Sequence, residues 1–131
     1  GPEIIPGLRL SGFPHEGKLP PANPDEIKKG WVLFAPDLTS AVGPWGQSFA
    51  ANITPDATGI GNWSEEAFIR AIREGKYKGM EQGRNLLPPM PWLSYRNMTE
   101  EDIRSIFVYL KTVNPVKNIV PDAIPPANPG T

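Results

Sequence analysis

Two stretches of the chain repeat apolar residues at the spacing of an amphipathic helix. Residues 64–75 begin with Ser64, a residue type that caps helix N-termini, and end at Gly75, a residue type common just after helices. Residues 99–112 begin with Thr99, and Asn114-Pro115 follows them as a stop signal. In both stretches the apolar residues lie three and four positions apart: Phe68, Ile69 and Ile72 in the first, and Ile103, Ile106, Phe107 and Leu110 in the second. Both stretches are therefore predicted to be helices.

The rest of the chain carries weaker signals of regular structure. A short helix is predicted from Asn23 to Lys29, because Pro24 suits a first helical position and Gly30 a stop. Residues 31–36, Trp-Val-Leu-Phe-Ala-Pro, form the most strand-like run, which is compatible with a small hairpin or with an extended buried strip. Residues 43–62 combine turn-forming residues with single apolar anchors, so an ordered loop packed by its own side chains is predicted there.

Proline and glycine are unusually frequent, at 17 and 13 of the 131 residues. Because prolines interrupt both helices and strand ladders, the Pro-rich segments 1–22 and 115–131 are predicted to be extended arms of a single domain that spans residues 1–131. The predicted fold class is all-α and loop-rich, with few short helices and at most a minor β-hairpin.

The charge and the content of reactive side chains exclude several function classes. The 13 basic and 14 acidic side chains give a net charge of -1 and form no long run of one sign, so no nucleic-acid partner is expected. No stretch has the ~20 apolar residues of a membrane span. The absence of cysteine excludes disulfides and thiolate metal sites within these residues. The single histidine, His15, lies in a polar turn and is predicted to be a surface residue rather than a metal ligand.

The segment Pro88-Pro89-Met90-Pro91-Trp92 places a methionine among three prolines. Proline restricts φ, so the segment is predicted to hold Met90 and Trp92 in an extended, pre-ordered conformation. A thioether is a soft ligand that suits haem iron opposite a histidine, whereas methionine more often fills gaps in apolar cores. The motif by itself leaves both roles open.

Several motifs in a fixed order resemble a bacterial class I cytochrome c over roughly residues 30–120. They are Trp45-Gly46, Asn52-Ile53-Thr54-Pro55-Asp56, Thr58-Gly59-Ile60-Gly61, Trp63-Ser64-Glu65, the helical stretch 68–75, Pro88-Pro89-Met90-Pro91-Trp92, and Met98-Thr99 through Lys111. The resemblance implies a cytochrome c-like fold, haem c as the cofactor, and an electron carrier that is not itself an enzyme but can be a subunit or domain of an oxidoreductase. It also implies a redox partner protein and a periplasmic or otherwise exported location.

The same resemblance implies a set of cofactor-binding residues. Met90 would be an axial ligand of the haem iron, with Pro89 beside it, and residues 99–112 would be the C-terminal helix of the family. Trp63, Arg84 and Tyr95 carry N–H or O–H donors that suit haem propionates, although Trp63 equally suits a core anchor and Arg84 a solvated loop.

The family attaches haem through an N-terminal Cys-x-x-Cys-His segment, and that segment is absent from these residues. Covalent attachment is therefore impossible with this chain alone. We expect either a truncated cytochrome domain, whose attachment segment lies upstream, or a natural haemless module that serves binding or structure in the periplasm. A secreted carbohydrate-binding protein is a third class, favoured only by tryptophans in loops. Truncation predicts that the helix 99–112 exposes its apolar stripe or buries it in a homodimer or domain swap.

Overall fold

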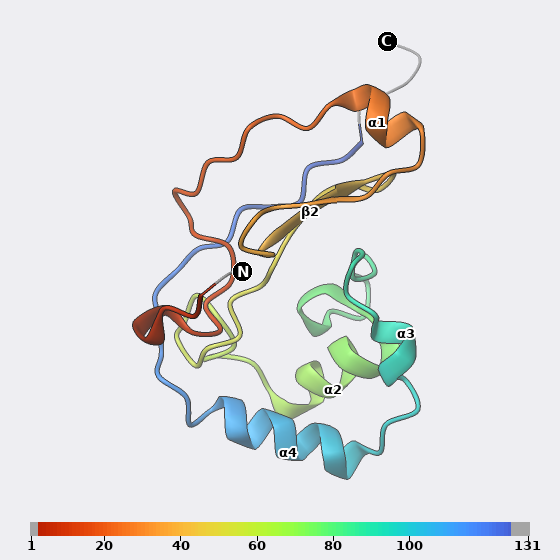
Figure 1. The fold of residues 1–131 in the computed structure, drawn as a ribbon. Coiled ribbons are helices and arrows are strands. Elements are labelled where there is room, and N and C mark those ends of the chain that lie inside the picture. The colour runs from red at the N-terminus through yellow and green to blue at the C-terminus, as the bar shows by residue number, and fades with distance from the viewer. Residues whose placement is uncertain (1–2, 127–131) are drawn as a thin grey trace.

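The computed structural model describes residues 3–126, so the outermost parts of the two predicted arms, residues 1–2 and 127–131, lie outside it. The elements are η1 (Pro6–Leu8), α1 (Pro24–Lys28), β1 (Leu33–Phe34), β2 (Ser40–Gly43), β3 (Gly46–Phe49), α2 (Glu65–Glu74), η2 (Tyr77–Gly79), α3 (Trp92–Tyr95) and α4 (Glu100–Leu110). Figure 1 shows α2, α3 and α4 at one end of the molecule and the small sheet with α1 at the other, with both terminal segments running along one side. None of these helices has the length and apolar character needed to cross a bilayer.

The three predicted helices are confirmed, together with their caps. The side chain of Asn23 accepts a hydrogen bond from the Asp25 backbone N–H at the start of α1. Ser64 accepts one from the backbone of Ala67 in α2, and Thr99 accepts one from the backbone of Asp102 in α4. Each cap satisfies a backbone donor that the first helical turn leaves without a partner.

A three-stranded antiparallel sheet in the order β1-β2-β3 shows that the all-α prediction is wrong. Strand β3 also lies inside residues 43–62, which were expected to form a loop. The paired residues are small or polar, as in Ala41 opposite Ser48, so these strands lack the alternation of large apolar and polar residues that identifies a strand in sequence. In β1, Leu33 and Phe34 are 37% and 50% exposed, which excludes the extended buried strip.

The core lies between α2 and α4. Its buried members come from these two helices and from the loop before α2: Ile60, Phe68, Ile103, Phe107 and Leu110. The rings of Phe68 and Phe107 pack with their centroids 5.1 Å apart. The expectation that α4 exposes its apolar stripe is therefore wrong, because the core cluster buries three of its four residues and only Ile106 remains 41% exposed. The helical period predicted the stripe, but it could not identify the partner face.

Two asparagine side chains hold the terminal segments in place, since Asn118 joins the C-terminal segment to the N-terminal segment and Asn52 joins the C-terminal segment to the middle of the chain. The Asn118 amide donates to the carbonyl oxygens of Ser11 and Phe13, each at 2.8 Å. The Asn52 amide donates to the carbonyl oxygen of Val116 at 2.9 Å. Segments without helix or strand must satisfy their backbone polar groups in other ways. Here the asparagine side chains supply hydrogen bonds to backbone carbonyl groups that a strand ladder would otherwise provide.

Candidate functional site

Met90 lies in the loop that joins η2 to α3. The loop begins where the Leu86 N–H donates to the Gly75 carbonyl oxygen at 2.7 Å, and it is closed by the Met90 N–H donating to the Leu87 carbonyl oxygen at 3.2 Å. Met90 is 38% exposed, so the residue lies at the surface of the molecule. A core gap-filler would be covered, and this position therefore leaves Met90 free to act as a ligand.

A hydrogen bond connects the Met90 loop to the sheet. The hydroxyl of Ser48 in β3 donates to the Pro88 carbonyl oxygen at 2.6 Å. The indole Nε1–H of Trp45 donates to the same hydroxyl oxygen at 3.1 Å. Ser48 is buried, and both bonds are partly buried. No pattern along the chain pointed to the contact between Ser48 and Pro88, because residues 40 positions apart meet only once the sheet has formed.

The other end of the loop is held by a ring packed on a glycine. Gly75, at the C-terminus of α2, has φ +63°, a left-handed conformation that glycine adopts without strain. A Cβ at this position would overlap the ring of Trp92, the first residue of α3. Trp92 is thus part of a helix and not of the extended segment predicted for it, and its indole holds α3 against the end of α2.

The other predicted site residues lie in different surroundings. Trp63 is half-buried and packs against the core cluster. The Arg84 guanidinium lies 3.9 Å from the centroid of the Tyr77 ring, and one of its N–H groups donates to the Asn85 carbonyl oxygen at 3.0 Å. Tyr95 is half-buried at the end of α3, and Pro89 is exposed beside Met90. Within residues 3–126, no hydrogen bond or ion pair joins the side chains of Trp63, Arg84 and Tyr95 to one another.

His15 lies where the two terminal segments meet. Its ring Nδ1 is 2.8 Å from the Ile119 carbonyl oxygen, and its backbone N–H donates to the Asn118 side chain at 2.8 Å. The imidazole therefore has a structural partner in the C-terminal segment. In the part of the chain that the structure describes, His, Asp and Glu side chains form no group of three that could hold a metal ion.

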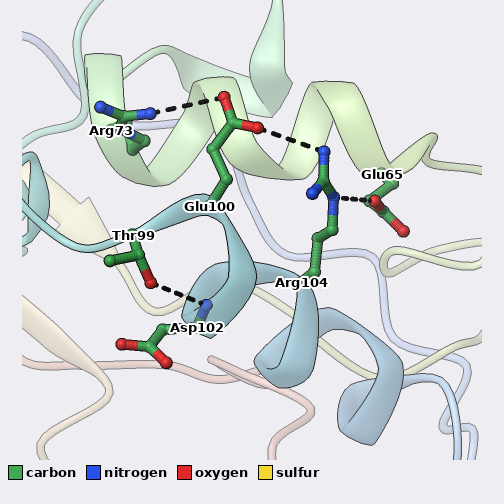
Figure 2. A network of polar contacts seen from close by, with 6 residues as sticks. All are labelled: Glu65, Arg73, Thr99, Glu100, Asp102 and Arg104. Atoms are coloured by element: carbon green, nitrogen blue, oxygen red, sulfur yellow. Dashed lines mark hydrogen bonds and ion pairs between the residues drawn. The ribbon is translucent and has the colours of Figure 1, made fainter.

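Charged side chains join α2 to α4 (Figure 2). Glu100 accepts from Arg73 at 3.5 Å and from Arg104 at 3.2 Å, and Arg104 also binds Glu65. The two carboxylates stand in first helical turns, where they also suit the positive end of the helix dipole. The side chains of the network are about half exposed, so these ion pairs contribute little to the free energy of unfolding.

The tryptophans have structural roles that bear on carbohydrate binding. Trp45 donates a hydrogen bond, Trp63 packs on the core and Trp92 packs on Gly75. Trp31 is 61% exposed and has no comparable partner among the described residues. Since a sugar platform needs exposed ring faces, three of the four tryptophans no longer support that class.

No family model matches the chain. A segment of 79 residues is 43% identical to a subunit of nicotinate dehydrogenase from Pseudomonas putida and covers 60% of the chain and 6% of that protein. A segment of 75 residues is 41% identical to the fructose dehydrogenase cytochrome subunit of Gluconobacter japonicus, covering 56% of the chain and 15% of the relative. The gluconate 2-dehydrogenase cytochrome c subunit of Pantoea cypripedii is 40% identical over 82 residues, which are 62% of the chain and 18% of the relative.

The chain thus spans less than a fifth of the length of each of these relatives. The cytochrome c subunits of quinone alcohol dehydrogenases are further relatives of the same kind. Over more than half of its length, this chain is similar to the cytochrome c subunits of dehydrogenases, and these relatives support a cytochrome c-like domain with a role in electron transfer.

Proposed function

We propose that this chain is an electron-transfer domain of a dehydrogenase complex in which Met90 is an axial ligand of haem iron. The proposal includes a redox partner protein, a periplasmic or otherwise exported location, and a single cytochrome c-like domain made of these residues and an attachment segment. The chain itself would carry electrons and catalyse no bond-making step.

The observation that carries the proposal is the way Met90 is held. Met90 is partly exposed, while the loop around it is fixed by three prolines, by Ser48 on one side and by the Trp92–Gly75 contact on the other. A rigid loop loses little conformational entropy when its side chain binds a metal. A thioether opposite a histidine also raises the reduction potential relative to two imidazoles, which suits an electron carrier.

The donor set fits haem at one axial position. Bound haem would supply a one-electron couple at its iron. Met90 would supply one ligand, and Arg84, Tyr95 and Trp63 have the N–H and O–H groups to bind propionates. These residues contain no cysteine, and His15 is engaged with Ile119, so the second ligand and the covalent attachment would come from outside these 131 residues.

The test uses protein expressed from its complete reading frame in a host with intact haem maturation. We expect a Soret band and a sharp α band on reduction. Met90→Ala should abolish the methionine–iron absorption near the red end of the oxidised spectrum and lower the potential. Met98→Ala is the control, because Met98 packs on the core and should mainly affect stability. Identical spectra for Met90→Ala and the parent would refute the assignment.

A haemless binding module is the second candidate, and the absence of cysteine favours it. Two observations distinguish the candidates: the coding sequence upstream of Gly1 and the colour of the purified protein. A Cys-x-x-Cys-His sequence within ~40 codons upstream of Gly1 would support the haem protein. A colourless protein from a native source that matures other cytochromes would support the haemless module.

A further inference from the structure

We infer that a groove on the far side of the sheet from Met90 is a binding site for a neutral aromatic small molecule that carries a hydroxyl or carbonyl group. The groove has a volume of about 570 Å³, and small-molecule sites typically measure ~300–1,000 Å³. Its lining residues fall within the segments 13–23, 33–36, 40–49 and 121–124. None of the residues proposed to contact haem lines the groove, so this site is separate from the proposed function.

The alternation of side chains in β3 places the groove behind the sheet. Gln47 and Phe49 line the groove, together with the β2 residues that pair with them. Ser48 lies between these two positions, and successive side chains of a strand point to opposite faces. The Ser48 hydroxyl bonds the Pro88 carbonyl oxygen in the Met90 loop. The groove and the Met90 loop therefore lie on opposite faces of the same small sheet.

The two terminal segments form walls of the groove where they pass the sheet (Figure 1). The Phe13 N–H donates to the Ala50 carbonyl oxygen, just after β3, at 3.0 Å. Gln47 and Ile124 exchange two backbone hydrogen bonds, at 2.8 and 2.9 Å. Both walls are thus fixed before a ligand binds, and a preformed site loses little conformational entropy on binding.

The lining of the groove favours a ligand without charge. It consists mostly of aliphatic, aromatic and proline side chains, and none of the described residues that line the groove is charged. A charged ligand would lose its hydration there without gaining a counter-ion. Two of the lining side chains, Phe13 and Phe49, form a tilted pair with ring centroids 4.8 Å apart. Since aromatic rings pack favourably in such geometries, the groove favours a neutral ligand with an aromatic ring.

One polar side chain in the lining has unused hydrogen-bonding capacity. The Gln47 Nε2 donates to the Ser40 hydroxyl at 3.0 Å. Within residues 3–126, no hydrogen bond uses the Gln47 side-chain carbonyl oxygen or the second N–H of its amide. The other polar lining side chains are engaged, since Ser40 also donates to the Ser48 carbonyl oxygen and Asn23 caps α1. A ligand hydroxyl would donate to the Gln47 carbonyl oxygen, and a ligand carbonyl would accept from its amide N–H.

The test measures binding of three probes of similar size to the 131-residue chain by NMR titration, which requires no haem. 2-Naphthol is the neutral aromatic probe, 2-naphthoate is its charged counterpart, and 2-decalol is its saturated, non-planar counterpart. The variant Val42→Trp fills the groove, and Gln47→Leu removes the amide. The matched controls are Val108→Trp and Gln82→Leu, at exposed positions outside the groove. Circular dichroism confirms that each variant is folded.

We expect 2-naphthol to bind about tenfold or more tightly than 2-naphthoate, because the groove offers no counter-ion. It should bind about threefold or more tightly than 2-decalol, which lacks an aromatic ring. Amide shifts should concentrate in the four segments that line the groove. Val42→Trp should abolish binding of 2-naphthol, and Gln47→Leu should weaken it about fivefold through the loss of one hydrogen bond. The controls should each change it by less than about twofold.

Equal or tighter binding of either counterpart would overturn the assigned class of ligand, and shifts centred outside the groove would overturn the site. Should Val42→Trp not fold, equal effects of Gln47→Leu and Gln82→Leu would still overturn the role of Gln47. A homodimer in sedimentation that dissociates in folded Val42→Trp would overturn the proposal in favour of a second copy as the occupant of the groove. Failure of the Met90 assignment in the spectral test would leave all these results unchanged, so the two proposals fail separately.

Discussion

The hydroxyl of Ser48 donates a 2.6 Å hydrogen bond to the carbonyl oxygen of Pro88, two residues before Met90. The bond connects β3, at one end of the molecule, to the loop between η2 and α3 (Figure 1). Pro88 belongs to the segment whose geometry decides where the Met90 thioether lies. The sheet, which the sequence did not predict in full, therefore supports the candidate site directly.

Replacing Ser48 by alanine should loosen this loop. Ser48→Ala leaves the Pro88 carbonyl and the Trp45 indole N–H without their partner, at a cost of about 1–2 kcal/mol of unfolding free energy. Urea denaturation measures the loss. Ser105→Ala is the matched control, because the Ser105 hydroxyl bonds the Glu101 carbonyl on the exposed side of α4 and should change stability by less than about 0.5 kcal/mol. Equal losses in the two variants would show that Ser48 has no special supporting role.

Replacing Gly75 by alanine should displace Trp92 and with it α3. The added Cβ meets both a left-handed backbone and the Trp92 ring, so Gly75→Ala should lower the unfolding free energy by about 2–4 kcal/mol. Gly30→Ala is a control for the backbone alone, since Gly30 has φ +99° and no atom within 4 Å of the added Cβ. Gly30→Ala should lower the unfolding free energy by about 1 kcal/mol. The Trp92 fluorescence should change only in Gly75→Ala, and an unchanged spectrum there would contradict the packing.

Removing the Asn118 side chain should release the N-terminal segment. Its amide donates to Ser11 and Phe13, and its carbonyl oxygen accepts the His15 N–H, so Asn118→Ala breaks three hydrogen bonds at once. We expect a loss of about 2–4 kcal/mol, since the carbonyl groups left behind are partly buried. Hydrogen exchange should accelerate at the amides of residues 11–15. Asn97→Ala, at an exposed position, should leave exchange there unchanged.

Lowering the pH should remove a contribution of Asp56 to the stability of the chain. The Thr58 hydroxyl and then the Thr58 backbone N–H bind the Asp56 carboxylate, and they lower the pKa of Asp56 from its ordinary value of 3.8. A lowered pKa in the folded state stabilises the fold above the unfolded pKa, and this contribution is lost as the pH falls through the folded pKa.

The parent should therefore be more stable than Asp56→Asn near about pH 6, and the difference should close as the pH falls below about 4. Thermal unfolding at a series of pH values measures it. Thr58→Ser keeps the hydroxyl and should keep the pH dependence. A difference between the parent and Asp56→Asn that stays constant with pH would contradict the assigned cause.

Local patterns in the sequence predicted α1, α2 and α4, but they did not predict the short helix α3. Asn23, Ser64 and Thr99 cap the helices that the sequence places after them, and Gly75 ends α2 in the left-handed conformation. Each of these signals acts over a few residues, so it requires no knowledge of the rest of the fold. The sheet could not be predicted in the same way because its strands are short and its facing residues, such as Ala41 and Ser48, are small or polar.

The sequence by itself determined where α1, α2 and α4 lie, where Met90 is placed among prolines, and that no residue of this chain can attach haem covalently. These are properties of single residues and of neighbours along the chain. Only the tertiary structure decided that α2 and the loop before it bury most of the apolar stripe of α4, that Ser48 holds the Met90 loop, and that Asn52 and Asn118 attach the terminal segments. Those relationships join residues tens of positions apart. A local sequence pattern does not specify which distant groups come into contact when apolar surface is buried and backbone polar groups form hydrogen bonds.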